Sequence, residues 1–340
     1  MKYQSVYKKK QKSYLFTLMF GVCLIVILFL LSLCYGSYRT TPLDVIYALI
    51  DSETNQQVYT IVSLSRFPRL IASMFVGASL SVAGVVYQEL FSNKMASPDI
   101  LGVSAGAGVG ASISIYYGLN FILTSIISFV GGVCSVLLTI YVSKLFKKKN
   151  NDNYSLIMAG IIISGLMNSF LGLFKYLSND SQLASITFWL LGGFYHISYN
   201  QLVYAIPIIV FGILVLYSIR WKIVMLRGGD KDAYSHGVNA KFIRAICIFF
   251  TTVITATSIC ISGTIGWVGL AIPNLMRILV NNDGKKLIPL SIVYGMVFMM
   301  ICDLLARSIT NTEIPIGILT GIIGVIMFVI VLLFQSKKVN

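Results

Sequence analysis

The chain has 340 residues, of which 57% are hydrophobic and only 11% are charged. Soluble domains carry about 25% charged residues, so this composition argues against a soluble globular protein and indicates a polytopic helical membrane protein. Lysine and arginine exceed aspartate and glutamate by 14. Most of these cations lie between apolar segments, so we attribute the excess to the enrichment of basic residues in cytoplasmic loops and not to nucleic-acid binding.

The expected fold class is an all-α polytopic membrane protein with about ten transmembrane helices, both termini cytoplasmic and a single transmembrane domain over residues 1–340. Each predicted helix has about 17–25 residues, the length that crosses a bilayer. The predicted helices are 14–35, 68–91, 98–117, 121–143, 154–177, 201–219, 242–262, 264–280, 287–306 and 314–334. We interpret 178–200 as a surface or re-entrant segment and 220–241 as a cytoplasmic loop.

The first apolar segment, 14–35, is longer than a signal-peptide core and lacks an Ala-x-Ala-like cleavage site, so we predict a retained helix. Pro68 suits the first turn of the second helix, where its missing N–H leaves no bond unmade. Arg66 and Arg69 then lie at one mouth of that crossing, and Asn93 lies near the other.

The basic residues test this topology. If the N-terminus is cytoplasmic, all but five of the 26 lysines and arginines fall in inner segments. The five others are Arg39, Arg66, Arg69, Lys175 and Arg307. Such asymmetry favours ten spans, and an eleventh span near Ile186 would remove it.

The chain lacks a GxxxxGK[ST] phosphate loop, an HExxH motif and a GxGxxG motif, so nothing indicates that it hydrolyses nucleotide itself. Its six cysteines all fall in apolar segments and form no CxxC pair, and with only two histidines a histidine metal site is improbable. The sequence from Gly102 to Gly106 matches the GxSxG nucleophile elbow around Ser104. That motif needs a strand–turn–helix and a histidine partner, so we interpret it as a chance match in a tightly packed membrane helix.

Asp303 and Arg307 are spaced to pair on one helix face, which would lower the cost of an acid inside the membrane. With Arg66 and Arg69 they suggest a cationic rim at the outer face. Such a rim can anchor lipid headgroups, or it can receive acidic groups of a soluble partner.

The loop 220–241 is the longest inner connection. Ala233, Tyr234, His236 and Val238 interrupt its polarity. Two interpretations remain open from these residues alone, a plain linker and short helices that seat in a cytosolic protein.

Several stretches, taken together, resemble one family. They are RFPR at 66–69, Gly84 and Gln88 before NKMASP at 93–98, LGVSAGA at 101–107, Trp189 with GGF at 192–194, AYSHGV at 233–238, GTIGWVGL at 263–270, Ile272-Pro273 with Arg277, Asp303 with Ala306-Arg307, and PIG at 315–317. In this order, over nearly the whole chain, they resemble the permease subunits of binding-protein-dependent ABC importers for iron–siderophores, haem and cobalamin (FecCD/BtuC-like).

The resemblance implies a type II ABC importer in the bacterial cell membrane. Two permease subunits, identical or related, would surround a central pathway, with two cytoplasmic ATPase subunits below and an extracytoplasmic substrate-binding protein above. The chain itself would be no enzyme, would need no cofactor and would contact membrane lipid. Its expected function is alternating-access import of a ferric siderophore, with a haem or cobalamin permease as the alternative.

The resemblance also assigns site residues. Docking of the binding protein falls to Arg66, Arg69 and Arg307. Coupling to the ATPases falls to Arg227, Gly228, Asp230, Ala233, His236 and Gly237, and the cytoplasmic gate to Asn93, Met95, Asn153 and Tyr154. The sequence departs from the family pattern at Lys94, Met95, His236 and Asn274.

Two rival functions belong to other classes. A secondary transporter driven by an ion gradient would need acids at the midplane, where only Asp303 qualifies. An intramembrane hydrolase would use Ser104 as its nucleophile.

Overall fold

The computed structural model describes residues 2–36, 38, 40–45, 56–146, 152–280, 283–310 and 312–336. Arg39 and the lysines at 147–149 and 337–338, which enter the predicted topology, lie outside these ranges. The elements are α1 (Lys2–Cys34), α3 (Gln56–Tyr59), η1 (Thr60–Arg66), α4 (Phe67–Leu90), η2 (Pro98–Leu101), α5 (Val103–Tyr116), α6 (Phe121–Leu145), α7 (Asp152–Leu177), α8 (Asp180–Leu191), α9 (Tyr199–Ser218), α10 (Arg220–Leu226), α11 (Asp230–Ser235), α12 (Ala240–Ser262), α13 (Val268–Val280), α14 (Gly284–Ser308) and α15 (Ile316–Ser336).

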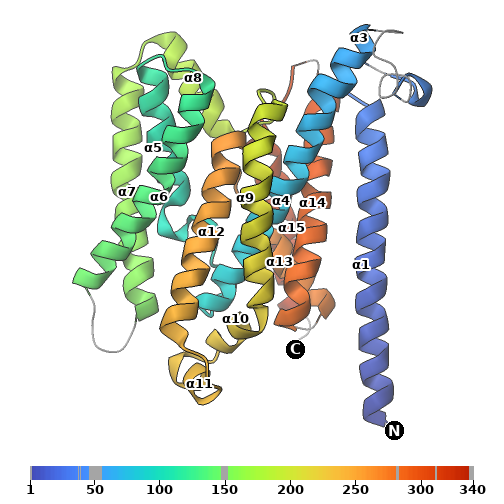
Figure 1. Cartoon of the computed structure of the whole chain (residues 1–340), viewed down its shortest axis with the longest axis vertical. Helices are drawn as coiled ribbons and strands as arrows, with labels where there is room; N and C mark the ends of the chain where they lie inside the picture. Colours follow the sequence, from blue (N-terminus) through green and yellow to red (C-terminus); the bar gives the residue numbers. More distant parts are fainter. Residues whose placement is uncertain are drawn as a thin grey trace.

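The long helices lie roughly side by side along one axis (Figure 1). Eight helical stretches in the described ranges are long and apolar enough to cross a membrane, and α5 and α13 are shorter apolar helices. The bundle has two ends: α10 and α11 lie at one, the α11 end, and α3 and α8 at the other, the α8 end (Figure 1). The helix α1 begins, and α15 ends, at the α11 end (Figure 1).

The two short helices fall where full crossings are predicted. Residues 98–117 divide into the 3-10 turn η2 and α5, because Gly102 adopts the left-handed conformation (φ 80°) between them. Residues 264–280 begin with an irregular stretch in which Trp267 has a φ of 69°, and the helix starts only at Val268. At 14 and 13 residues, α5 and α13 are each roughly 20 Å long, less than the roughly 30 Å hydrocarbon core.

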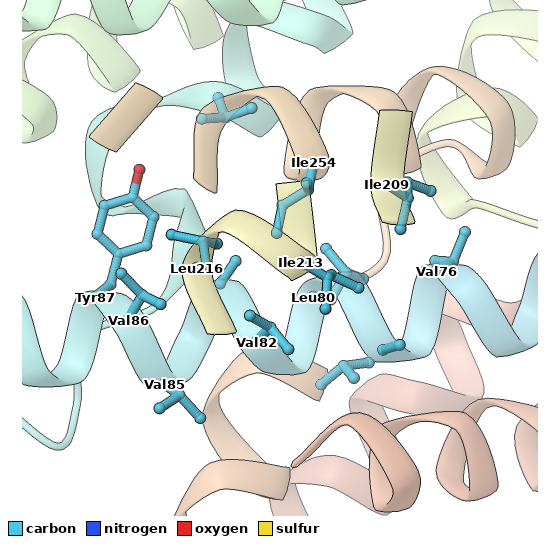
Figure 2. Packing of buried hydrophobic residues seen from close by; sticks show 14 of the residues in the cluster. Val76, Leu80, Val82, Val85, Val86, Tyr87, Ile209, Ile213, Leu216 and Ile254 are labelled. Carbon is cyan, nitrogen blue, oxygen red and sulfur yellow. The ribbon is translucent and has the colours of Figure 1, made fainter. Parts of the chain in front are cut away.

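The core is built around α4, the most buried of the spans. Its apolar side chains, Val76 and Leu80 among them, pack against Ile209 and Ile213 of α9 and Ile254 of α12 (Figure 2). At the opposite extreme, α1 stands at the side of the bundle and packs mainly along α14 (Figure 1). The span of the exposed helix α1 is more apolar in sequence than the span of the buried helix α4, so apolarity alone does not indicate which helix lies in the core.

The helix that contains α4 is longer than predicted. The sequence places Pro68 in a first turn, but the helix continues back through the π-helical turns of η1 to Gln56. Within η1 the bonds reach five residues back, as from the Phe67 N–H to the Val62 carbonyl. Pro68 has no N–H for the Ser63 carbonyl, and the Tyr199 hydroxyl of α9 donates to that oxygen at 2.5 Å. Proline is thus accommodated inside the helix.

The two segments left open by the sequence are also helical in part. The stretch 178–200 contains α8, which begins with a capping box formed by Asn179 and Gln182. The loop 220–241 contains α10 and α11, with Ala233 fully buried. Of the two interpretations of this loop, the structure supports short helices.

Backbone contact between helices depends on particular glycines, and Gly84 of α4 shows this most sharply. A Cβ at Gly84 would lie 1.8 Å from the Gly269 carbonyl oxygen of α13, whereas a Cβ at Gly165 of α7 would meet nothing within 4 Å. We expect Gly84→Ala to destabilise the protein by at least about 1–3 kcal/mol, because α4 and α13 must separate. The matched change Gly165→Ala should be neutral or slightly stabilising, since alanine favours helix.

Thermal unfolding of the two purified variants in detergent measures this difference. Equal melting temperatures for the two variants would contradict the close approach of α4 to α13.

Candidate functional site

An ion-pair network at the α8 end joins α4 to α14. Arg69 donates from Nε to the Asp303 Oδ1 at 2.6 Å and from Nη1 to the Glu313 Oε2 at 2.6 Å. Arg307 lies 3.1 Å from the other Asp303 oxygen, which confirms the predicted pairing of these residues along α14. Asp303 is fully buried, and two guanidinium groups therefore share its charge.

Arg66 and Arg307 are held by α1 and the residues that follow it. Arg66 donates to the Leu33 carbonyl at 2.6 Å, to the Thr40 hydroxyl at 3.0 Å and to the Tyr38 carbonyl. Arg307 donates to the Ser32 hydroxyl and carbonyl. The described residues offer Arg66 no carboxylate, so neutral oxygens alone solvate its charge.

The structure thus brings together the three arginines predicted to dock a partner, and it encloses them. Arg66, Arg69 and Arg307 are each only 4% exposed. The acid Glu313, which the sequence analysis did not single out, is the accessible member, with 37% of its side chain exposed. Three cations against two carboxylates leave this outer arginine cluster (Arg66, Arg69, Asp303, Arg307 and Glu313) with a formal charge of +1.

Tyr195 lies beside this cluster, in the connection between α8 and α9. Burial, the main cause, and the charge of Glu313 raise the pKa of its hydroxyl, while Arg69 opposes the shift. The phenol therefore stays protonated at neutral pH and donates to the Phe188 carbonyl at 3.1 Å.

A second buried network, nearer the α11 end, was missed as a site by sequence reasoning. Arg277 of α13 donates to Glu89 at 2.8 Å and to the Gln88 amide oxygen at 3.1 and 3.3 Å. The side chains of Arg277 and Glu89 are 3% and 2% exposed. The signal was present, because Glu89 is the one charge between Leu70 and Phe91 and a lone buried acid needs a cation.

The predicted gate residues lie close to one another at the α11 end. Asn153 of α7 donates to the Leu90 carbonyl at the end of α4, at 3.3 Å. Asn93 follows directly and accepts from the Met95 N–H at 2.9 Å. Met95 and Tyr154 are largely exposed. The segment after α4 and the start of α7 are therefore neighbours, as a shared gate requires.

The predicted coupling residues form a compact unit beside them. Asp230, the first residue of α11, accepts from Arg244 of α12 at 2.7 Å. The Ser92 hydroxyl donates to the Arg227 carbonyl at 3.0 Å and so ties the segment after α4 to the segment after α10. Gly237 ends the unit with a φ of 73°, while His236 is exposed to solvent. A Cβ at Gly228 would displace the side chain of Asp232.

A cavity of about 350 Å³ with a mixed polar and apolar lining lies between α5, α7 and the irregular stretch before α13. Asp99, Ser104, Ser164, Asn168 and Thr264 line it, and its lining among the described residues includes no lysine or arginine. Asp99 is exposed to this space and accepts a hydrogen bond from Ser104. The cavity therefore combines polar groups and one acid with an apolar wall that includes Leu171 and Leu190.

The described ranges give little support to the other functions considered, which are an intramembrane hydrolase, a metal site and a secondary transporter. Ser104 follows a 3-10 turn instead of a strand, and its recorded partner is Asp99, not a histidine. No group of three or more His, Cys, Asp or Glu side chains in those ranges could hold a metal ion. The buried acids Glu89 and Asp303 are both paired with arginine, which disfavours the coupling-ion site of a secondary transporter.

Comparison with known proteins gives a consistent result over nearly the whole chain. The FecCD transport family matches residues 24–334. The molybdate import system permease protein MolB of Haemophilus influenzae is 34% identical over 292 residues, which are 85% of this chain and 84% of the relative. A protein named as an iron chelatin transport system permease from Helicobacter pylori is 30% identical over 91% of this chain and 93% of its own length.

Other relatives carry other substrate names, vitamin B12 for a Photorhabdus laumondii permease at 31% identity and hemin for a Yersinia pestis permease at 28%. Among solved structures, an inward-facing conformation of an ABC transporter assigned to the metal-chelate type superposes with a TM-score of 0.83 at 30% identity. The match covers 93% of this chain and 98% of that one.

The buried pair of Glu89 and Arg277 provides a test of the inner network. Because removing one partner leaves an uncompensated buried charge, Arg277→Met alone should destabilise the protein by about 3–5 kcal/mol. Glu89→Gln combined with Arg277→Met should recover most of that loss. A double-mutant cycle of thermal unfolding, with both single variants measured, gives the coupling; purely additive effects would contradict the pairing.

Proposed function

This chain belongs to the FecCD transport family, and we propose that it forms the membrane pathway through which a ferric siderophore enters a bacterial cell. It is a multi-pass protein of the bacterial inner membrane and the permease of a type II ABC importer for metal chelates. The observation that carries the proposal is the end-to-end match of its fold to a metal-chelate ABC transporter.

The cavity at Asp99 favours a chelate over a bare oxyanion. Its lining includes Asp99 and, among the described residues, no cation, so no positive side chain there would compensate the charge of a molybdate dianion. A large neutral or cationic complex can instead use the hydroxyl and amide groups of Ser104, Ser164 and Asn168. A haem or cobalamin complex is the alternative cargo of the same pathway.

The mechanism we propose is alternating access, with ATP hydrolysed by two separate ATPase subunits at the α11 end and a second permease subunit completing the pathway. The ATPases would hold α11 and its flanking residues. The hydrogen bond between Ser92 and the Arg227 carbonyl connects that surface to the gate segment at Asn93 and Met95. A displacement of α10 and α11 would therefore act directly on the gate.

The outer arginine cluster is the proposed docking site of an extracytoplasmic binding protein. Since Glu313 forms an ion pair with Arg69 and is itself exposed, an incoming carboxylate would compete with Glu313 for the Arg69 guanidinium group. Arg66, which has only neutral partners among the described residues, supplies further attraction. Docking is in this view an exchange of carboxylates, which avoids leaving a bare buried cation.

Uptake by intact cells tests the substrate. Deleting this gene should abolish accumulation of a ⁵⁵Fe-labelled siderophore, because the deletion removes the proposed membrane pathway of that chelate, and the wild-type chain should restore it. Radiolabelled molybdate, cobalamin and hemin are measured in the same strains. Loss of molybdate uptake alone would overturn the siderophore assignment, whereas loss of none of the four would count against the permease function itself.

Charge at the outer arginine cluster tests docking. Glu313→Gln raises the formal charge of the cluster from +1 to +2, so it should speed association with an acidic binding protein by roughly threefold at low salt and less at high salt. Asp180→Asn, which removes an exposed acid at the same end outside the cluster, is the matched control. Binding of the co-purified binding protein to the assembled transporter is measured by surface plasmon resonance; equal rates for both variants would refute this docking site.

A further inference from the structure

A groove of about 440 Å³ opens between α6, α7 and α12 near the α11 end, and it shares Arg244 with the coupling unit described above. Its walls are mainly apolar, with Val136 and Ile140 from α6, Leu156 from α7 and Ile248 from α12. At its edge Leu137 and Phe249 are 59% and 61% exposed. Within a membrane, such walls face acyl chains.

Three cations gather at one end of the groove. Lys144 lies in the last turn of α6, and Lys241 and Arg244 lie in the first turns of α12. Within the described ranges neither lysine forms an ion pair, and the Nε of the buried Arg244 has no hydrogen-bond partner. Ser143 and Ser155 add hydroxyl groups at the same end. This end therefore suits an anion.

The length of the groove agrees with one leaflet. Along α12 the lining runs from Lys241 to Val253, a rise of roughly 18 Å at 1.5 Å per residue. One leaflet of the hydrocarbon core is about 15 Å thick. A headgroup held at the cations would thus place its acyl chain along the whole apolar wall.

We propose that this groove binds one acidic phospholipid, with the phosphate at Lys144, Lys241 and Arg244 and an acyl chain between α6 and α12. Charge complementarity selects the occupant, because a basic pocket between membrane helices recognises anionic headgroups. Arg244 also holds Asp230 of α11 at 2.7 Å. The bound lipid therefore contacts a residue that positions the proposed coupling segment.

Native mass spectrometry of the purified full-length chain, titrated with phosphatidylglycerol or with phosphatidylcholine of the same acyl chains, tests this site. Phosphatidylglycerol should bind more tightly, and Lys144→Gln with Lys241→Gln should weaken it roughly 25-fold, about fivefold per lysine. The matched control, Lys12→Gln with Lys222→Gln, removes two exposed cations outside the groove and should change the affinity less than twofold. Inorganic phosphate at the same concentration should not displace the lipid.

Filling the apolar wall gives an independent readout that does not depend on charge. Ala245 lines the groove, and Ala245→Phe should weaken both lipids about tenfold while the protein keeps its melting temperature. The proposal would be overturned if the two lipids bound with equal affinity, or if the groove variant and the control variant lost the same affinity for phosphatidylglycerol. Undiminished lipid binding by Ala245→Phe would also overturn it. Displacement by inorganic phosphate would reduce it to a simple anion site, and burial of the groove by a second copy of the chain would also refute it.

Discussion

The cost of placing charge inside a membrane governs this structure. The central helix α4 carries Arg69 towards one membrane surface and Glu89 towards the other, and both are buried. Neither could remain there alone, since an unpaired charge at this depth costs several kcal/mol. Arg69 is paired with Asp303 of α14 and Glu89 with Arg277 of α13, so α4 is held to a different neighbour at each end.

Between these two pairs the helices approach closely, and this depends on glycine. A Cβ at Gly77 would lie 2.2 Å from the Gly295 carbonyl oxygen of α14, and Gly84 meets Gly269 of α13 in the same way. Without a strong hydrophobic force between helices in lipid, backbone contact and polar pairs supply the association. The ion pairs and the glycines therefore act on the same helix faces and fix the same register.

Sequence reasoning found the helices and failed mainly at their breaks. Apolar length predicts a crossing at 98–117 and at 264–280, but hydropathy does not register that Gly102 and Trp267 take positive φ directly before α5 and α13, which shortens these two helices. It found the pair of Asp303 and Arg307 because both lie on one helix, four residues apart. The pair of Glu89 and Arg277 joins residues 188 positions apart, and no local spacing indicates such a contact. Sequence reasoning also did not predict the burial of the outer arginines, because their partners come from α1, from α14 and from Glu313.

The unbroken course of the helix from Gln56 to Leu90 has a mechanical consequence. Arg69 and Glu89 are separated by roughly 30 Å of continuous helix, and the backbone has no hinge between them because Pro68 and the π-helical turns lie before Arg69. A tilt imposed where Ser92 bonds the Arg227 carbonyl would then be transmitted to the opposite surface by the helix itself, without a relay of side chains. Because the helix is rigid, binding of a partner at one membrane surface would change the position of α4 at the other surface.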